Sequence, residues 1–163
     1  MYFAQQHPEY LHKLVVADMG VKAYPRHHDL IFTGIKAVDV KSCDSRKTAT
    51  ERLSAHISDV GTQQFLLKNL YWQEPGVLAW RFNAEVLEQE IDEVLKPVTD
   101  TPVNLPTLFI RGGKSDYIKD EDMESIRRIF PNSFFETIEG AGHWLNAEKP
   151  KTFLELSLTF LKG

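Results

Sequence analysis

The stretch "ETIEGAGHWLNAEKP", residues 136–150, places a histidine shortly after a strand-like run. Residues 134–138 have the composition of a β-strand, and Gly140 and Gly142 end that strand just before His143. A helix is expected to open near Pro150, because proline is favoured in the first turn of a helix. The pattern therefore puts His143 between a strand and a helix, where a catalytic base often lies.

Two other short runs also have the composition of β-strands and lead into polar residues. Leu14–Ala17 carries two central valines and is followed by Asp18, and residues 107–110 run into the turn that holds Ser115 and Asp116. Continuous apolarity, rather than alternation, is typical of parallel strands that are covered on both faces. Strands that alternate with helices predict an α/β fold with right-handed crossovers.

The middle of the chain has a different character. Residues 19–97 are predicted to be a helical insertion, and residues 1–18 and 98–163 to form one α/β layer. Within the insertion, helices are expected over residues 28–40, 47–57, 63–70 and 84–95, with Thr62 and Asn83 as N-caps of the last two. In the α/β layer, helices are expected over residues 120–130 and 150–161.

Composition narrows the classes of function. The chain has 163 residues, 42% hydrophobic and 26% charged, and a formal net charge of −4 without long blocks of either sign. These values fit a globular protein and favour neither a nucleic-acid partner nor a membrane partner. No run has the length of a signal peptide's apolar region or of a membrane span. The single cysteine, Cys43, permits no internal disulfide and fits a cytoplasmic setting.

Each of the three predicted strands leads into a residue that can do chemistry: Asp18, the pair Ser115 and Asp116, and His143. The carboxyl ends of parallel strands meet at one edge of a sheet, which is where ligands bind in open α/β sheets. In acyl transfer a histidine takes a proton from a nucleophile while a carboxylate holds its other ring nitrogen. Asp18 and Asp116 are both candidates for that carboxylate.

Four blocks, "LVVAD", "WRFN", "PTLFIRGGKSDYI" and "IEGAGHWLNAEKP", resemble those of bacterial YbfF-type esterases in the α/β-hydrolase superfamily. The resemblance implies the C-terminal part of an α/β-hydrolase fold with three parallel strands and an inserted helical cap. It also implies a serine hydrolase of short-chain acyl esters and acyl-coenzyme A thioesters, with His143 as the base, Asp18 as the acid and Ser115 supporting the histidine. Asp116 stays an alternative acid, since many superfamily members place that aspartate after the seventh strand.

The sequence departs from this family in its nucleophile. The family places the nucleophilic serine in a Gly-x-Ser-x-Gly turn, and no serine of this chain has that setting: Ser42, Ser45, Ser54, Ser58, Ser115, Ser125, Ser133 and Ser157. Loss of one oxyanion donor alone costs roughly 100-fold in turnover. We therefore expect the chain to be inactive alone and to be a piece of a longer hydrolase. The alternative is a truncated, non-catalytic binding or assembly module.

Substrate contacts are predicted for Trp80, Arg81, Phe82 and Trp144. The aromatic rings could line an acyl pocket or simply pack in a core. Arg81 could meet an anionic group of the substrate or a surface carboxylate. The adjacent His27 and His28 lack acidic or cysteine partners at ligand spacing, so neither a metal nor another cofactor is expected.

The first apolar strand predicts a partner. Without an inner neighbour, Leu14–Ala17 would expose a row of unpaired N–H and C=O groups at an apolar sheet edge. We expect this edge to pair either with a missing N-terminal half or with a second copy of the chain. A second copy would pair antiparallel about a two-fold axis.

Overall fold

The apolar runs of the sequence form a three-stranded parallel sheet, in the order β1-β4-β5. The computed structural model describes all 163 residues, and the strands are β1 Leu14–Ala17, β4 Thr107–Gly112 and β5 Ser133–Ile138. Phe109 of the central strand pairs with Val16 on one side and Phe135 on the other. The predicted parallel α/β sheet is therefore confirmed, and β4 continues two residues beyond its predicted end.

Helices cover both faces of this sheet, as the continuous apolarity of β1 predicts. One face packs on α1 Tyr2–Gln6 and α7 Met123–Ile129. The short 3₁₀ helix η1 Pro8–Tyr10 follows α1, and the 3₁₀ helix η3 Asp120–Asp122 precedes α7. The other face packs on α8 Leu145–Glu148 and α9 Pro150–Lys162. Phe109 points to the first face and its neighbour Leu108 to the second, so both are fully or almost fully buried.

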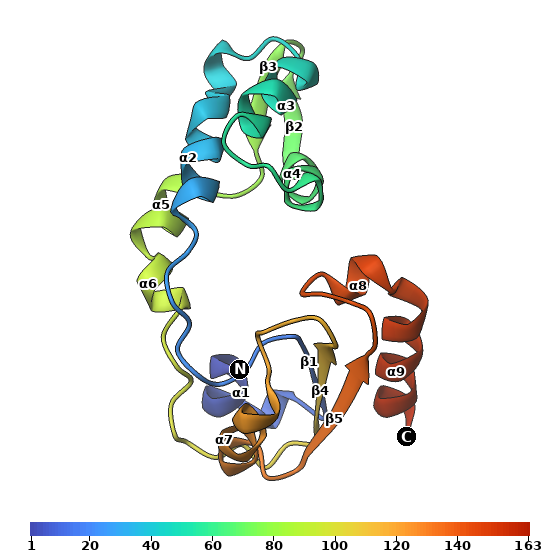
Figure 1. Ribbon diagram of the computed structural model, residues 1–163. Coiled ribbons are helices and arrows are strands. Elements are labelled where there is room, and N and C mark those ends of the chain that lie inside the picture. The colour runs from blue at the N-terminus through green and yellow to red at the C-terminus, as the bar shows by residue number, and fades with distance from the viewer. The chain divides into compact units, whose positions relative to one another are not determined.

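The chain divides into two units, Met1–Ala23 with Pro97–Gly163 and Tyr24–Lys96. The first unit contains the parallel sheet with its helices, and Figure 1 shows the elements of each. The second unit starts five residues after the predicted start of the insertion, residue 19, and ends one residue before its predicted end, residue 97.

The second unit has its own hydrophobic core, around Val38, Leu53, Leu70 and Leu78. Its elements are α2 Asp29–Val38, η2 Val40–Ser42, α3 Arg46–Ser54, α4 Val60–Leu67, β2 Leu70–Glu74, β3 Val77–Trp80, α5 Ala84–Gln89 and α6 Ile91–Val94. β2 and β3 form an antiparallel hairpin that the sequence analysis did not predict. The hairpin joins at the Glu74, Pro75, Gly76 turn, where Gly76 has a positive φ of 82°.

Two predicted helix features of this unit are wrong in detail. The N-cap of α4 is Asp59, whose Oδ2 accepts a hydrogen bond from the Thr62 backbone N–H at 2.6 Å, so Thr62 lies inside the helix. The helix predicted over residues 84–95 is broken at Glu90, which has φ −100° and ψ 11°. Asn83 does cap its first half, as predicted, through the Val86 N–H.

Two further features bear on the sequence analysis. Cys43 is buried and forms no disulfide. Among the helices, none is both long and apolar enough to cross a lipid bilayer.

Candidate active site

Asp18 is the buried centre of the candidate site. It directly follows β1, where its N–H still bonds to the Ile110 carbonyl at 2.8 Å. Its φ of 45° lies in the left-handed region, which aspartate tolerates better than most residues. The chain leaves the sheet at this residue, and its side chain is fully buried.

Three donors satisfy the Asp18 carboxylate. Oδ1 accepts from the Gly112 N–H at 3.1 Å. Oδ2 accepts from His143 Nδ1 at 2.8 Å and from the Ser115 hydroxyl, at a shorter distance. A buried carboxylate is costly unless it is hydrogen-bonded in this way. The carboxylate at the end of β1 is thus hydrogen-bonded by groups that lie at or after the ends of β4 and β5.

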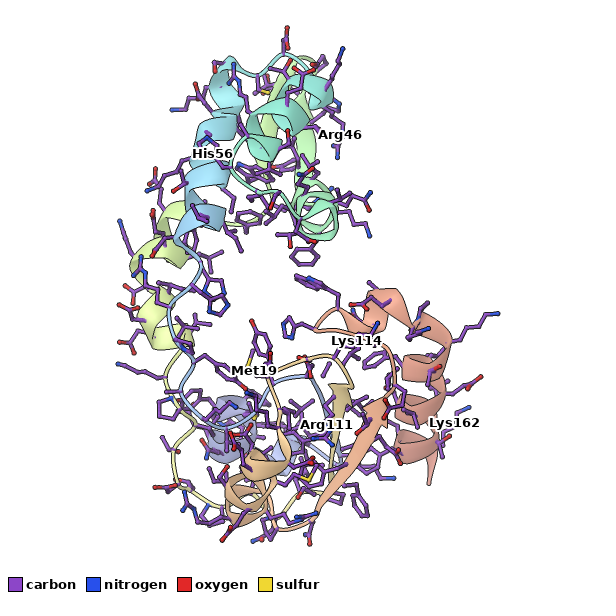
Figure 2. The ribbon with its side chains drawn as sticks, in the orientation of Figure 1. Met19, Arg46, His56, Arg111, Lys114 and Lys162 are labelled. Atoms are coloured by element: carbon purple, nitrogen blue, oxygen red, sulfur yellow. The ribbon has the colours of Figure 1, made fainter.

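The loop before His143 is fixed against the end of β4. A Cβ on Gly112 would lie 2.3 Å from the Gly142 carbonyl oxygen, so only glycine permits this approach of two backbones. The Lys114 N–H donates to the Ala141 carbonyl at 2.9 Å. The Gly142 N–H donates to Glu148 Oε2, also at 2.9 Å. The loop is therefore held from β4 on one side and from α8 on the other, and Lys114 can be followed in Figure 2.

His143 is oriented by its contact with Asp18. Because the carboxylate accepts from Nδ1, the neutral ring carries its proton on Nδ1 and leaves Nε2 as the proton acceptor. The side chain is 31% exposed, so it is accessible to a reacting group. The Trp144 ring lies next to it, with ring centroids 5.5 Å apart and a 59° tilt. In this arrangement the imidazole can accept and return a proton while Asp18 stabilises its charged form.

Tyr117 is a neighbour of His143 that the sequence analysis missed. Its ring lies flat against the imidazole, with centroids 3.7 Å apart and 14° between the planes. Burial, and then the negative charge of Asp18, raise the pKa of the Tyr117 phenol above its usual value. The phenol therefore stays protonated at neutral pH. Sequence spacing gives no sign of this contact, since an aromatic residue in a turn has many uses.

The alternative acid Asp116 has a different setting. Its side chain is 90% exposed and lies 3.3 Å from the Lys119 ammonium group. The structure thus brings Asp18, and not Asp116, into hydrogen-bond contact with His143. Ser115 contacts Asp18 rather than the histidine itself, so any support that it gives to His143 passes through the carboxylate.

The remaining candidate residues belong to both units. Trp144 lies beside His143 in the first unit, as described above. In the second unit, the rings of Trp80 and Phe82 stack with centroids 5.3 Å apart and pack on that unit's core. The Arg81 guanidinium lies over the Tyr71 ring, 4.7 Å from its centroid. These contacts describe packing, and the substrate contacts expected of these residues remain predictions.

No metal centre is found in the chain, since no group of three or more His, Cys, Asp or Glu side chains is arranged to hold an ion. The rings of His27 and His28 stack on each other, with centroids 4.3 Å apart. The Nδ1 atom of His27 lies 2.8 Å from the Pro25 carbonyl oxygen. The pair is therefore packed locally and does not converge on a common ligand.

Comparisons with known proteins give relatives along almost the whole chain. The mouse protein "sn-1-specific diacylglycerol lipase ABHD11" is 35% identical over 168 residues, which cover 99% of this chain and 54% of the relative. "Esterase YbfF" of Escherichia coli is 34% identical over 150 residues, covering 91% of this chain and 57% of the relative. The chain thus spans about half the length of these curated relatives. No family model matches it.

Solved structures that resemble this chain also include an esterase and a hydrolase. The "Marine microorganism esterase" superposes with a TM-score of 0.91 at 37% identity, over 98% of this chain and 64% of the other. The E-2-(acetamidomethylene)succinate hydrolase has a TM-score of 0.67 at 16% identity, which supports the fold alone. By sequence and by fold, the chain belongs to the α/β-hydrolase superfamily and is a homologue of the YbfF-type and ABHD11 esterases.

Proposed function

We propose that this chain supplies the acid and base of a serine-type carboxylic-ester hydrolase, with His143 as the base and Asp18 as the acid. The observation that carries the proposal is the 2.8 Å contact of His143 Nδ1 with a fully buried carboxylate. A buried carboxylate keeps the imidazole in one tautomer and stabilises the imidazolium that forms during acyl transfer. Asp116 is too exposed to water for that role.

In this mechanism Nε2 of His143 accepts the hydroxyl proton of a nucleophile as the nucleophile attacks an acyl carbonyl. The imidazolium then donates that proton to the leaving alkoxide or thiolate. The Asp18 carboxylate orients the ring and stabilises the imidazolium, and it is itself held by the N–H of Gly112 and the hydroxyl of Ser115. The relatives' names, an esterase and a diacylglycerol lipase, support an ester as the substrate. Short-chain acyl esters and acyl-coenzyme A thioesters are the proposed class, and the second unit is the proposed cap.

The proposed nucleophile lies outside residues 1–163, so the chain as given is proposed to be inactive alone. β1 is an outer strand of the sheet, with β4 on one side only. Its free backbone groups are the proposed docking edge for a nucleophile-bearing segment, or for a second copy that covers it. Pairing with the segment would restore catalysis, whereas pairing with a copy would leave the chain a binding or assembly module.

The acid and base can be tested in the chain itself by NMR of ¹⁵N-labelled histidine. In the wild type, His143 should carry its proton on Nδ1. In Asp18→Asn, the amide group that faces Nδ1 can donate a proton, so the neutral ring should shift its own proton to Nε2. Asp116→Asn is the matched control and should leave the tautomer unchanged. A tautomer that responds to Asp116 and not to Asp18 would overturn the assignment.

Activity needs the missing nucleophile. A chimera in which the unmatched part of the marine esterase is fused ahead of Met1 should hydrolyse p-nitrophenyl butyrate, while the 163-residue chain should not. His143→Ala should abolish turnover in the chimera, and Asp18→Asn should lower it by roughly 10⁴-fold. Turnover by the chain alone that depends on His143 would show that it holds its own nucleophile. An active chimera that tolerates His143→Ala would refute the proposed base.

A further inference from the structure

The face of the His143 ring is covered by Tyr117. The two rings are nearly parallel, at 14°, and their centroids are 3.7 Å apart. The Asp18 carboxylate approaches the same imidazole in the ring plane, at Nδ1. The imidazole is thus contacted in its plane by a charge and on its face by an aromatic ring, and it keeps an exposed fraction of 31%.

The position of Tyr117 is fixed independently of His143. Its backbone N–H lies 3.3 Å from the Ser115 hydroxyl oxygen and donates to it, and that hydroxyl in turn donates to Asp18. The next residue, Ile118, is 2% exposed and belongs to the hydrophobic core beneath the sheet. The turn after β4 therefore carries the tyrosine ring on a backbone anchored from both sides.

A ring in this place can do two things for a catalytic imidazole. Stacking removes rotational freedom about the bond to the ring, which keeps Nδ1 aimed at the carboxylate. The negative face of an aromatic ring also attracts a cation that lies within about 6 Å of its centroid, by about 0.5–1 kcal/mol at exposed sites. The imidazolium that forms when His143 accepts a proton meets that condition.

We propose that Tyr117 is a positioning residue, whose ring holds the His143 imidazole in line with Asp18 and stabilises its protonated form. The role rests on the proposed function of His143. The geometry assigns the role to the ring, because the ring is the part of the side chain that lies flat against the imidazole. Phenylalanine should therefore preserve the effect of the tyrosine, whereas leucine, which is apolar but smaller and has no ring, should not.

The test uses the 163-residue chain and compares Tyr117→Phe with Tyr117→Leu by NMR. The His143 ring protons should show an upfield ring-current shift in the wild type and in Tyr117→Phe, and should lose it in Tyr117→Leu. The Nδ1 proton should exchange with water about 2- to 10-fold faster in Tyr117→Leu, the factor that corresponds to the loss of about 0.5–1.5 kcal/mol from an aromatic pair. The phenylalanine variant should stay within about 2-fold of the wild type.

Three outcomes would overturn the proposal. In the first, Tyr117→Leu keeps the wild-type ring shifts and exchange rate. In the second, Tyr117→Phe behaves like the leucine variant, which would assign the effect to the hydroxyl. In the third, the active chimera with Tyr117→Leu shows a raised KM and an unchanged kcat, which would indicate a substrate contact. The expected result is instead a kcat about 2- to 5-fold lower than that of the unsubstituted chimera, at unchanged KM. Failure of the proposed base would appear separately, as chimera turnover that tolerates His143→Ala.

Discussion

Replacement of Gly112 by alanine should displace the loop that carries His143. The added Cβ would lie 2.3 Å from the Gly142 carbonyl oxygen and 2.7 Å from that of Ala141. Ordinary contact begins at 3.4 Å, so the two backbones must separate by about 1 Å. Both obstructing atoms belong to the backbone, so no change of side-chain rotamer can relieve the clash. The Asp18 carboxylate also loses its best alignment with the Gly112 N–H, 3.1 Å away.

Gly112→Ala should therefore have two measurable effects. Overpacking of this kind costs about 1–3 kcal/mol, which a urea unfolding curve will detect as a lower midpoint. A displacement of about 1 Å would also stretch the 2.8 Å contact of His143 Nδ1 with Asp18 beyond hydrogen-bond range. NMR should then show an Nδ1 proton that exchanges rapidly or is absent. In the active chimera, misplacement by about 1 Å should lower kcat by roughly 100-fold.

Gly142→Ala is the matched control, since it adds the same methyl group to the facing loop. The atoms nearest to its Cβ belong to the Glu148 carboxylate, whose oxygens lie at 3.2 Å and 3.8 Å, and that carboxylate lies at the end of a flexible side chain. Gly142→Ala should therefore be milder in both measurements. The explanation would be refuted if Gly112→Ala kept the wild-type unfolding midpoint and a protected Nδ1 proton.

Two further predictions concern the second unit. Ser45→Ala removes the N-cap of α3, where the Ser45 hydroxyl accepts a hydrogen bond from the Thr48 N–H at 3.1 Å. The substitution should lower the free energy of unfolding, measured in urea, by about 1 kcal/mol. A free energy of unfolding equal to that of the wild type would show that the cap is dispensable. Burial, and then the neighbouring His27, lower the pKa of His28 below its usual 6.5. The native state therefore resists protonation more than the unfolded chain does, so stability should be full above about pH 6.5 and fall as the pH drops toward the lowered value. His28→Gln should flatten this dependence in unfolding curves measured from pH 7 to pH 5, and an unchanged slope would contradict the assignment.

The sheet could be predicted from the sequence because its strands have a local cause. Leu14–Ala17 and residues 108–110 are continuously apolar, and the structure buries their alternate residues on opposite faces. The parallel direction of these strands follows from the rule that strands alternating with helices join by crossovers. Neither inference needs a distant contact, which is why both were confirmed.

The hairpin of the second unit could not be predicted in the same way. Its pairing shifts between Trp72 and Glu74, where the register is irregular, so the alternation of buried and exposed residues is interrupted. Only Leu70 and Leu78 of its two strands are fully buried. A strand identified by its period of two needs an uninterrupted run, and the bulge removes it.

The helix predicted over residues 84–95 failed for a related reason. Its apolar stripe has the right spacing, yet Val86, Leu87 and Val94 are exposed and only Ile91 is buried. The period shows that residues can share one helical face but does not show what covers that face. With little burial to stabilise a continuous helix, the chain departs from helical geometry at Glu90.

The choice between Asp18 and Asp116 shows where sequence reasoning about the site ends. Both aspartates follow strands of the same sheet, so topology brings each of them to the same edge as His143. What separates them is solvation. Asp18 is fully buried and meets three donors, whereas 90% of the Asp116 side chain is in water beside a lysine. Water screens an exposed carboxylate, so it would stabilise an imidazolium only weakly, while a buried carboxylate interacts with it through a lower dielectric. The left-handed φ of Asp18 turns the chain out of the sheet at this point, and its 125-residue separation from His143 places that geometry beyond any local pattern.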